Sequence, residues 1–334
     1  MALSRRRILV GAAVSTAVTA GLGGLPARAQ TRAGGEPYPS RPIRIIVPYG
    51  AGSTTDMAMR MIAPRMSQSL GQPLIIDNKS GATGAIGSDA VAKSPPDGYT
   101  LVMGTVASHA TLVPLMPTLP YNVLRDFTPI GRAATPPGLV VVHPSVPART
   151  LAEFVAYSKT EPNGVDYASS GVGGSGHLAT ELLRLKTGAK IVHVPYRDVG
   201  RGISDLLAGR VKMMIYYAPL LPHIRSGDLR GLAVLSERRV AFAPDLPTAI
   251  EQGVPGLIAS GWTGLFGPAG LPDTIRDRIY AAMKDALLDP SIQPLLADQG
   301  QEAAPLPSLE FQRFVEAEID KWAEVVKVAD IRLD

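Results

Sequence analysis

Two turns rich in glycine and hydroxyl groups contain the residues of this chain that are best suited to chemistry. The first covers residues 48–56, with the sequence PYGAGSTTD, and the second covers residues 169–177, with the sequence SSGVGGSGH. Glycine lets the backbone approach a bound group closely, and hydroxyl and backbone N–H groups donate hydrogen bonds to anions. Both turns therefore indicate an anion site, in particular for a carboxylate. For the first turn taken alone, an ordinary strand–helix connection that binds nothing explains the pattern about equally well.

The local sequence places the first turn between a strand and a helix. The β-branched run at residues 43–47 predicts a buried strand, and residues 57–70 predict a helix. Ser53 and Asp56 form a capping-box pattern, so we expect the helix to begin at Thr54. The free N–H groups of its first turn would then point at whatever lies above the strand.

The second turn also matches two enzyme motifs, and both interpretations are weak. Residues 171–176 match the dinucleotide-binding pattern G-x-G-x-x-G, with Asp198 at a suitable distance, but Asp198 falls in a predicted turn and the serines favour an anion cradle. Ser175 and His177 resemble a nucleophile and its base, but a G-x-S-x-G elbow requires glycine where His177 stands. No acid is placed to orient His177, so we predict no catalytic residues.

Predicted strands and helices alternate along the chain around these turns. Further strands are predicted at residues 74–77, 100–104, 165–168, 191–194, 211–216 and 264–268. Residues 127–131 and 139–143 flank the turn at 136–138, where we expect the chain to leave one domain for another. Further helices are predicted up to residue 93, at residues 150–159 and 178–186, up to residue 209, and at residues 274–288, 291–298 and 308–328. The first three strands each lead into a polar loop, the third into residues 105–109. This order predicts α/β architecture with a parallel sheet whose carboxyl edge carries the ligand.

Charge and composition exclude several classes of protein. The chain has 33 Lys+Arg and 29 Asp+Glu, but four arginines and no acid lie in residues 1–29, which leaves 33 − 4 = 29 basic against 29 acidic residues. This neutral remainder gives no support for nucleic acid binding. The chain has no cysteine, which excludes disulfides and thiolate sites, and its five histidines show no paired motif. We therefore expect no metal and no cofactor.

Residues 1–29 predict an export signal. Arg5 to Arg7 resemble a twin-arginine motif, the interrupted apolar stretch 8–25 suits a signal better than a permanent membrane helix, and Ala27 and Ala29 form a small-x-small cleavage site. We expect removal of the signal near Ala29 and a periplasmic protein. The choice between the twin-arginine and the general secretory route stays open.

Motifs spread along the chain resemble the substrate-binding proteins of tripartite tricarboxylate transporters, the Bug family. Besides the two turns, the matching segments are YPSRPI at 38–43, LGQP at 70–73, NKSGA at 78–82, PDGYTL at 96–101, LPY at 119–121, DFTPI at 126–130, VPY at 194–196, LPHI at 221–224 and DLPT at 245–248. Each motif is weak alone. Their ordered occurrence over nearly all of the chain after the signal makes the resemblance specific.

The resemblance implies an α/β fold of the two-lobed, type II periplasmic binding protein kind. Each lobe would be a mainly parallel sheet flanked by helices, with the ligand in the interlobe cleft. With crossings predicted near residues 136–138 and 257–262, lobe 1 comprises residues 30–134 plus 262–334, and lobe 2 comprises residues 135–261. The family further implies a small carboxylate ligand, inner-membrane transporter subunits as partners, a monomer and no enzyme activity. A receptor that reports to a sensor protein, or less well a periplasmic enzyme, remains an alternative.

The resemblance also implies that backbone N–H groups, hydroxyls and bridging water hold the ligand, and it implies which residues contact it. Carried over position by position, they are Tyr49, Gly50, Ala51, Ser53, Thr54, Ala82, Thr83, Thr105 and Ser108 in lobe 1, and Ser169, Ser170, Gly173, Ser175, His177 and Tyr196 in lobe 2. This chain departs from the family where the strand at 211–216 ends in two tyrosines, so Tyr216 joins the set. Whether Tyr216 or Tyr217 lines the pocket or packs under the hinge, and which carboxylate is bound, stays open.

Overall fold

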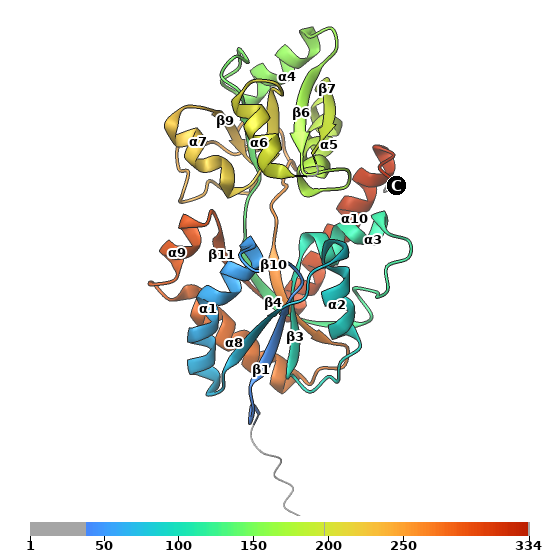
Figure 1. Cartoon of the computed structure of the whole chain (residues 1–334), viewed down its shortest axis with the longest axis vertical. Helices are drawn as coiled ribbons and strands as arrows, with labels where there is room; N and C mark the ends of the chain where they lie inside the picture. The colour runs from blue at the N-terminus through green and yellow to red at the C-terminus, as the bar shows by residue number, and fades with distance from the viewer. Residues whose placement is uncertain (1–37, 197, 333–334) are drawn as a thin grey trace, which may run out of the picture. The chain divides into compact units, whose positions relative to one another are not determined.

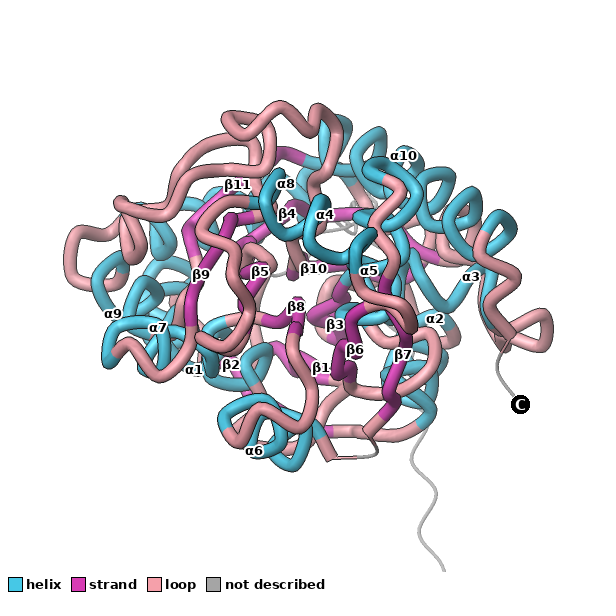
Figure 2. Tube along the Cα trace, turned by 90° about the horizontal axis from the view of Figure 1, so that it is seen from above, coloured by secondary structure: helices cyan, strands magenta, loops and turns pink. Residues whose placement is uncertain are grey.

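The computed structural model describes residues 38–332 except residue 197, so the export signal and cleavage site predicted within residues 1–29 lie outside the described residues. The described chain forms two β-sheets with helices packed around them (Figure 1, Figure 2). Within this part of the chain, no helix combines the length and the apolar character needed to cross a bilayer.

The first sheet has the strand order β11-β4-β10-β3-β1-β2. Its strands are β1 (Ile43–Val47), β2 (Leu74–Asn78), β3 (Thr100–Thr105), β4 (Phe127–Thr135), β10 (Thr263–Pro268) and β11 (Glu302–Pro307). β2 and β3 pair parallel with β1, as the sequence predicts, whereas β10 pairs antiparallel with β3 and β4, and β11 pairs antiparallel with β4. The sequence pattern did not predict β11.

The second sheet has the strand order β7-β6-β8-β5-β9. Its strands are β5 (Leu139–Val142), β6 (Val165–Ser169), β7 (Ile191–Pro195), β8 (Met213–Tyr216) and β9 (Arg230–Val234). β6 pairs parallel with β7 and β8, and β5 pairs antiparallel with β8 and β9. Both sheets are thus mixed, where the resemblance implied mainly parallel sheets, because the strands that enter or leave each sheet run against the strands of its βα units.

Ten α-helices of the described chain surround the sheets. They are α1 (Thr54–Leu70), α2 (Ala85–Ala92), α3 (Leu112–Leu115), α4 (Leu151–Thr160), α5 (Ser175–Thr187), α6 (Val199–Leu207), α7 (Leu221–Ser226), α8 (Asp273–Leu288), α9 (Gln293–Asp298) and α10 (Ser308–Val328). The predicted helix starts at Thr54 and Ser308 are confirmed, whereas α5 begins three residues before its predicted start.

The first sheet is buried on both faces, since alternate residues of a strand point to opposite sides. In β1, Ile43 and Ile45 pack with α1 and α8, while Ile46 belongs to the cluster on the other face, which contains Phe311 of α10. An apolar stripe along α10 belongs to this core. Phe311, Val315 and Trp322 are buried, and Phe314 and Ile319 pack against them.

Two extended segments carry the chain between the sheets, and they are hydrogen-bonded to each other (Figure 1). Pro137 and Ser260 form an antiparallel bridge, and Gly261 N donates to Pro136 O at 2.8 Å. A Cβ on Gly138 would lie 2.7 Å from Ala259 O, so the close approach requires glycine there. Since β4 ends and β10 begins at these segments, the carboxyl-end loops of both sheets face the same region.

Candidate ligand-binding site

A cavity of about 400 Å³ is lined by loops and helix ends that follow strands of both sheets. Nine of the sixteen residues predicted from the sequence line it, namely Tyr49, Ser53, Thr54, Thr83, Thr105, Ser170, Gly173, Ser175 and Tyr216. Tyr217 lines it as well, so both tyrosines face the cavity. No lining residue in the described chain carries a formal charge.

The first wall of the cavity, residues 48–56, is fixed by a buried carboxylate. Ser53 caps α1, and its Oγ accepts a hydrogen bond from Asp56 N at 3.2 Å. Asp56 is 2% exposed, and its carboxylate accepts from Gly52 N at 2.9 Å, from Arg60 Nε at 3.0 Å and from Asn78 Nδ2 at 2.9 Å. Burial alone would raise the pKa of Asp56, but these hydrogen bonds together lower it below its ordinary value. The carboxylate therefore serves the turn and does not face the ligand.

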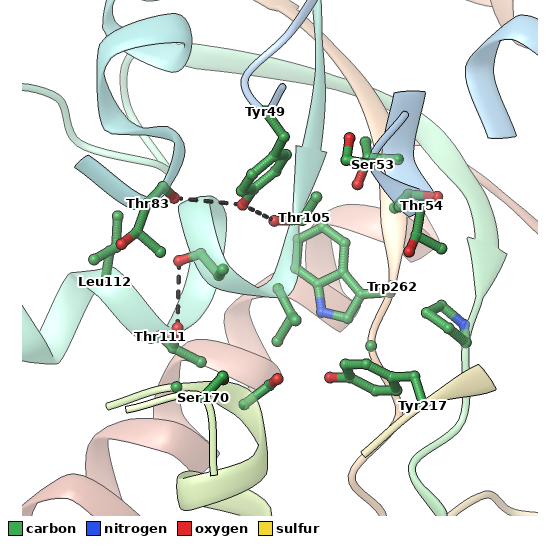
Figure 3. Close-up of a pocket in the computed structure, with 18 of the residues that line it drawn as sticks. Tyr49, Ser53, Thr54, Thr83, Thr105, Thr111, Leu112, Ser170, Tyr217 and Trp262 are labelled. Atoms are coloured by element: carbon green, nitrogen blue, oxygen red, sulfur yellow. Dashed lines mark hydrogen bonds between the residues drawn. The ribbon is translucent and has the colours of Figure 1, made fainter. Parts of the chain in front are cut away.

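Tyr49 extends the first wall toward the strand β3 (Figure 3). Its hydroxyl shares a hydrogen bond with Thr105 Oγ1 at 2.6 Å and donates to Thr83 O at 3.4 Å. Thr83 adopts the left-handed conformation, with φ of 56°. Burial raises the pKa of Tyr49, so its hydroxyl keeps its proton and remains a neutral group of the wall.

The polar loop predicted after β3 is instead a π-helix, η2 (Ala107–Thr111), continued by α3. Ser108 is 0% exposed; its Oγ accepts from Thr105 N at 3.1 Å and contacts His109 Nδ1 at 2.9 Å. His109 is stacked on Phe266, and burial lowers its pKa to about 3. Ser108 thus supports this wall from behind, while Val106, Ala107, Thr111 and Leu112 line the cavity.

The second wall, residues 169–175, meets the N-terminus of α5. Gly174 is the N-cap residue, and it supplies no side chain to cap the helix, so the first-turn N–H groups stay available to a ligand. A Cβ on Gly176 would lie 2.6 Å from Ile215 O, so α5 can pack closely against β8 only with glycine there. The sequence placed this helix start too late because Gly174 and Gly176 weaken the helical pattern.

A pair of stacked histidines holds the second wall. The rings of His177 and His193 lie 3.9 Å apart with an interplanar angle of 7°. His177 Nδ1 accepts from Gly173 N at 3.0 Å, and His193 Nε2 contacts Ser169 Oγ at 2.6 Å. Burial, and then the neighbouring His177, lower the pKa of His193 to about 4, and burial lowers the pKa of His177. The pair is therefore neutral near pH 7.

Seven predicted residues lie outside the lining. Ser169 and His177 hold the second wall, and Ser108 supports the first. Gly50, Ala51 and Ala82 are exposed beside the first wall, because the turn directs Ser53 and Thr54 to the cavity instead. Tyr196 donates to Asp205 Oδ2 at 2.9 Å and packs in the core of the second sheet. His177, engaged with Gly173, is not placed as a base for Ser175.

Several lining residues were missed by sequence reasoning. Trp262 follows the crossing segment, its ring faces the cavity, and its Nε1 donates to Glu318 of α10 at 3.2 Å (Figure 3). Thr263 opens β10 and Gln301 precedes β11. No local motif marks these three residues, since the pairing of β4 with β10 and β11 brings them to the cavity. Within the described chain, no cluster of three or more His, Cys, Asp or Glu residues could hold a metal ion.

Comparison with known proteins gives consistent matches. Residues 58–331 match the family described as "Tripartite tricarboxylate transporter family receptor". The protein BugT of Bordetella pertussis is 36% identical over 335 residues, covering 100% of this chain and 100% of BugT.

Solved structures match over most of the described chain. A structure from R. palustris with adipate is 37% identical, covers 88% of this chain and 99% of its own, and has a TM-score of 0.74. The structure of MatC from Rhodopseudomonas palustris with bound malate is 31% identical, covers 86% of this chain and 100% of its own, and has a TM-score of 0.70.

Proposed function

Because the chain belongs to the tripartite tricarboxylate transporter receptor family, we propose that it is a periplasmic receptor for a small carboxylate. The ligand is held in the cavity and delivered to inner-membrane transporter subunits. The observation that carries this proposal is the lining itself, where the N-termini of α1 and α5 meet hydroxyl groups and, among the described residues, no charged side chain. We further propose lobe boundaries at residues 134/135 and 261/262, next to the two crossing segments.

The lining can stabilise an anion without a cation. The N-terminus of a helix carries a partial positive charge that stabilises a nearby anion by roughly 0.3–2 kcal/mol, depending on burial. A hydrogen bond to a charged group adds about 1.5–3 kcal/mol. Ser53 and Thr54 at α1 and Gly173 and Ser175 at α5 provide such contacts from both sheets. One carboxylate can therefore bridge the two walls, and this binding joins the lobes around it.

The size and the aromatic lining set limits on the ligand. A cavity of about 400 Å³ lies at the lower end of the range for small-molecule sites. Trp262, Tyr216 and Tyr217 offer apolar ring surface together with hydroxyl groups. Burial raises the pKa of Tyr217 to about 12, so this phenol stays neutral and can donate to an anion. The lining thus suits a carboxylate with a short carbon skeleton.

A thermal-shift screen over mono-, di- and tricarboxylates and aromatic acids tests the proposal. A ligand present at 100 times its Kd should stabilise the protein by roughly 2.7 kcal/mol. The same protein, purified from its native periplasm, should retain a chemically unchanged acid. Turnover of a carboxylate by the purified protein would instead support the enzyme alternative. Transport that continues without the receptor while a transcriptional response to the acid disappears would support the sensor alternative.

Export by the twin-arginine route is a second part of this proposal. Replacement of Arg5 and Arg6 by lysine should block processing and leave the precursor in the cytoplasm, because this route depends on the arginine pair. Pulse-chase analysis of precursor and mature protein checks it. Normal processing of the double variant, together with sensitivity to inhibition of the general secretory machinery, would assign that route instead.

A further inference from the structure

Two buried oxygen atoms on residues that line the cavity have no hydrogen-bond partner among the described residues, and we propose that they select the ligand. They are Gln301 Oε1 and Thr263 Oγ1, on residues that are 1% and 5% exposed. The proposal rests on the proposed function: the receptor prefers a hydroxycarboxylate, whose hydroxyl donates to Gln301, over the matched carboxylate that lacks the hydroxyl.

The orientation of the Gln301 amide is set by its neighbour on α1. Gln301 Nε2 donates to Thr54 O at 3.4 Å, and a backbone carbonyl can only accept. The amide oxygen therefore points away from Thr54 O and is the atom left without a donor. Because buried polar groups are nearly always hydrogen-bonded, an unpartnered amide oxygen on a cavity-lining residue indicates that a bound molecule supplies the missing donor.

Thr263 provides the second oxygen of this subsite, from the strand on the other side of β4. Thr263 pairs with Ala134 of β4 from one side, and Ala303 of β11 pairs with Ala134 from the other. Thr263 therefore lies on one of the strands that flank β4 and Gln301 directly precedes the other, at the end of the sheet that borders the cavity. A threonine hydroxyl can both donate and accept, whereas the Gln301 oxygen can only accept. A ligand hydroxyl, which does both, can therefore pair with either residue.

The donor on the ligand should be a neutral hydroxyl and not an ammonium group. Among the described residues, no acidic side chain lines the cavity, so an ammonium would be buried without a counter-charge. Gln301 also contacts Thr54, the first residue of α1, where the helix presents its positive end. A hydroxyl donates the same hydrogen bond without this repulsion. A carboxylate with a methylene at that position would leave both oxygens unsatisfied.

Matched ligand series test this selectivity by calorimetry on the mature protein. The four-carbon series is malate, succinate and aspartate, and the six-carbon series is 2-hydroxyadipate, adipate and 2-aminoadipate. On the skeleton that fits, we expect the hydroxy acid to bind at least about tenfold more tightly than the two others. Gln301→Met, which keeps the side-chain length and removes the acceptor, should bring the hydroxy-to-methylene ratio close to one.

Two further variants keep the test specific. Thr263→Val, an isosteric change, should lower the same ratio by a smaller factor and serves if Gln301→Met does not fold. Thr187→Val is the matched control, because Thr187 does not line the cavity and its hydroxyl already donates to Leu183 O at 2.7 Å. Its hydroxy-to-methylene ratio should equal that of the wild type.

The outcomes separate this inference from the function on which it rests. Carboxylate binding with a ratio near one on every skeleton would overturn the subsite and leave the receptor function intact, with ordered water as the partner of Gln301. A ratio that persists in both Gln301→Met and Thr263→Val would also overturn it. A folded wild-type protein that binds no carboxylate would overturn the proposed function, and the subsite with it.

Discussion

The two walls of the cavity present the same kind of group, the N–H donors of a helix N-terminus, but they are held in opposite ways. The wall before α1 is fixed by an ionised carboxylate, Asp56, which ties Gly52, Arg60 and Asn78 together. The wall before α5 is fixed by two neutral imidazoles, of which His177 accepts from Gly173 N. Either an ionised or a neutral group behind a turn can thus fix the turn, and neither group is a charged side chain in the lining.

The strongest test of the first wall removes its carboxylate. Asp56→Ala leaves the donors of Gly52, Asn78 and Arg60 without their acceptor, so we expect the free energy of unfolding to fall by about 3 kcal/mol. Urea unfolding followed by circular dichroism measures the change. The matched control is Asp277→Ala, because Asp277 pairs with Arg276 on the surface and should matter by less than about 0.5 kcal/mol. Equal effects of the two variants would refute the distinct role of Asp56.

As the pH falls, protonation should destabilise the second wall before it destabilises the first. His193 titrates near its ordinary pKa of 6.5 in the unfolded chain and at about 4 in the folded protein, so the unfolded state binds more protons between these values. The contribution to stability is complete above pH 6.5 and is lost as the pH falls to about 4, by on the order of 3 kcal/mol. Carboxylate affinity should hold until the pH approaches about 4, because only there does His193 of the folded protein take up a proton.

The variant His193→Gln separates this effect from other titrations. Glutamine can still hydrogen-bond to Ser169 but does not titrate, so its stability curve should be flatter between pH 6.5 and 4. His109, whose pKa is about 3, is present in both proteins and cancels in the comparison. Parallel curves for the variant and the wild type would show that the imidazole pair does not govern the second wall.

Removing one hydroxyl from each wall compares their contributions to binding. Thr54→Ala and Ser175→Ala should each weaken carboxylate binding about tenfold, equivalent to about 1.4 kcal/mol, with little change in stability. Neither residue is the N-cap of its helix, so the helices should remain capped as they are. Calorimetric titration measures both losses. Unchanged affinity in both variants would mean that backbone N–H groups alone hold the ligand.

The smallest effect is expected at the one lysine near the first wall. Lys79 is exposed and does not line the cavity, so Lys79→Ala should change the affinity less than about twofold because solvent screens its charge. Calorimetric titration with the same carboxylate measures this change in affinity. Loss of binding in this variant, with normal binding by Thr54→Ala and Ser175→Ala, would replace the uncharged cradle by a salt bridge.

The first wall could be predicted from the sequence because its signals are local. Ser53 and Asp56 lie three residues apart, and their spacing alone specifies the helix start that the structure contains. The second wall was recognised as an anion turn, but the roles of Ser169 and His177 depend on His193, one strand away. Such tertiary contacts leave no periodic pattern in the sequence.

Tertiary contacts also determine the parts of the fold and cavity that the sequence does not predict. Ser108 and His109 follow a strand and look polar, yet packing against Phe266 turns this segment into a buried helical turn. Trp262 and Gln301 reach the cavity only because the chain returns to the first sheet and pairs on both sides of β4. The resemblance to a family implied that the chain returns to the first lobe, but it did not imply this pairing.

Gly300, beside Gln301, has no Cβ and therefore allows a close approach to the other side of the cavity. A Cβ on Gly300 would lie 2.4 Å from Cβ of Ala218, which follows Tyr217 on the other side of the cavity. A side chain there would disfavour the arrangement in which both walls face one ligand. The apparent affinity falls in proportion to the population of that arrangement, so every ligand would lose the same factor. Selectivity and overall affinity are thus controlled by adjacent residues, and each can change without the other.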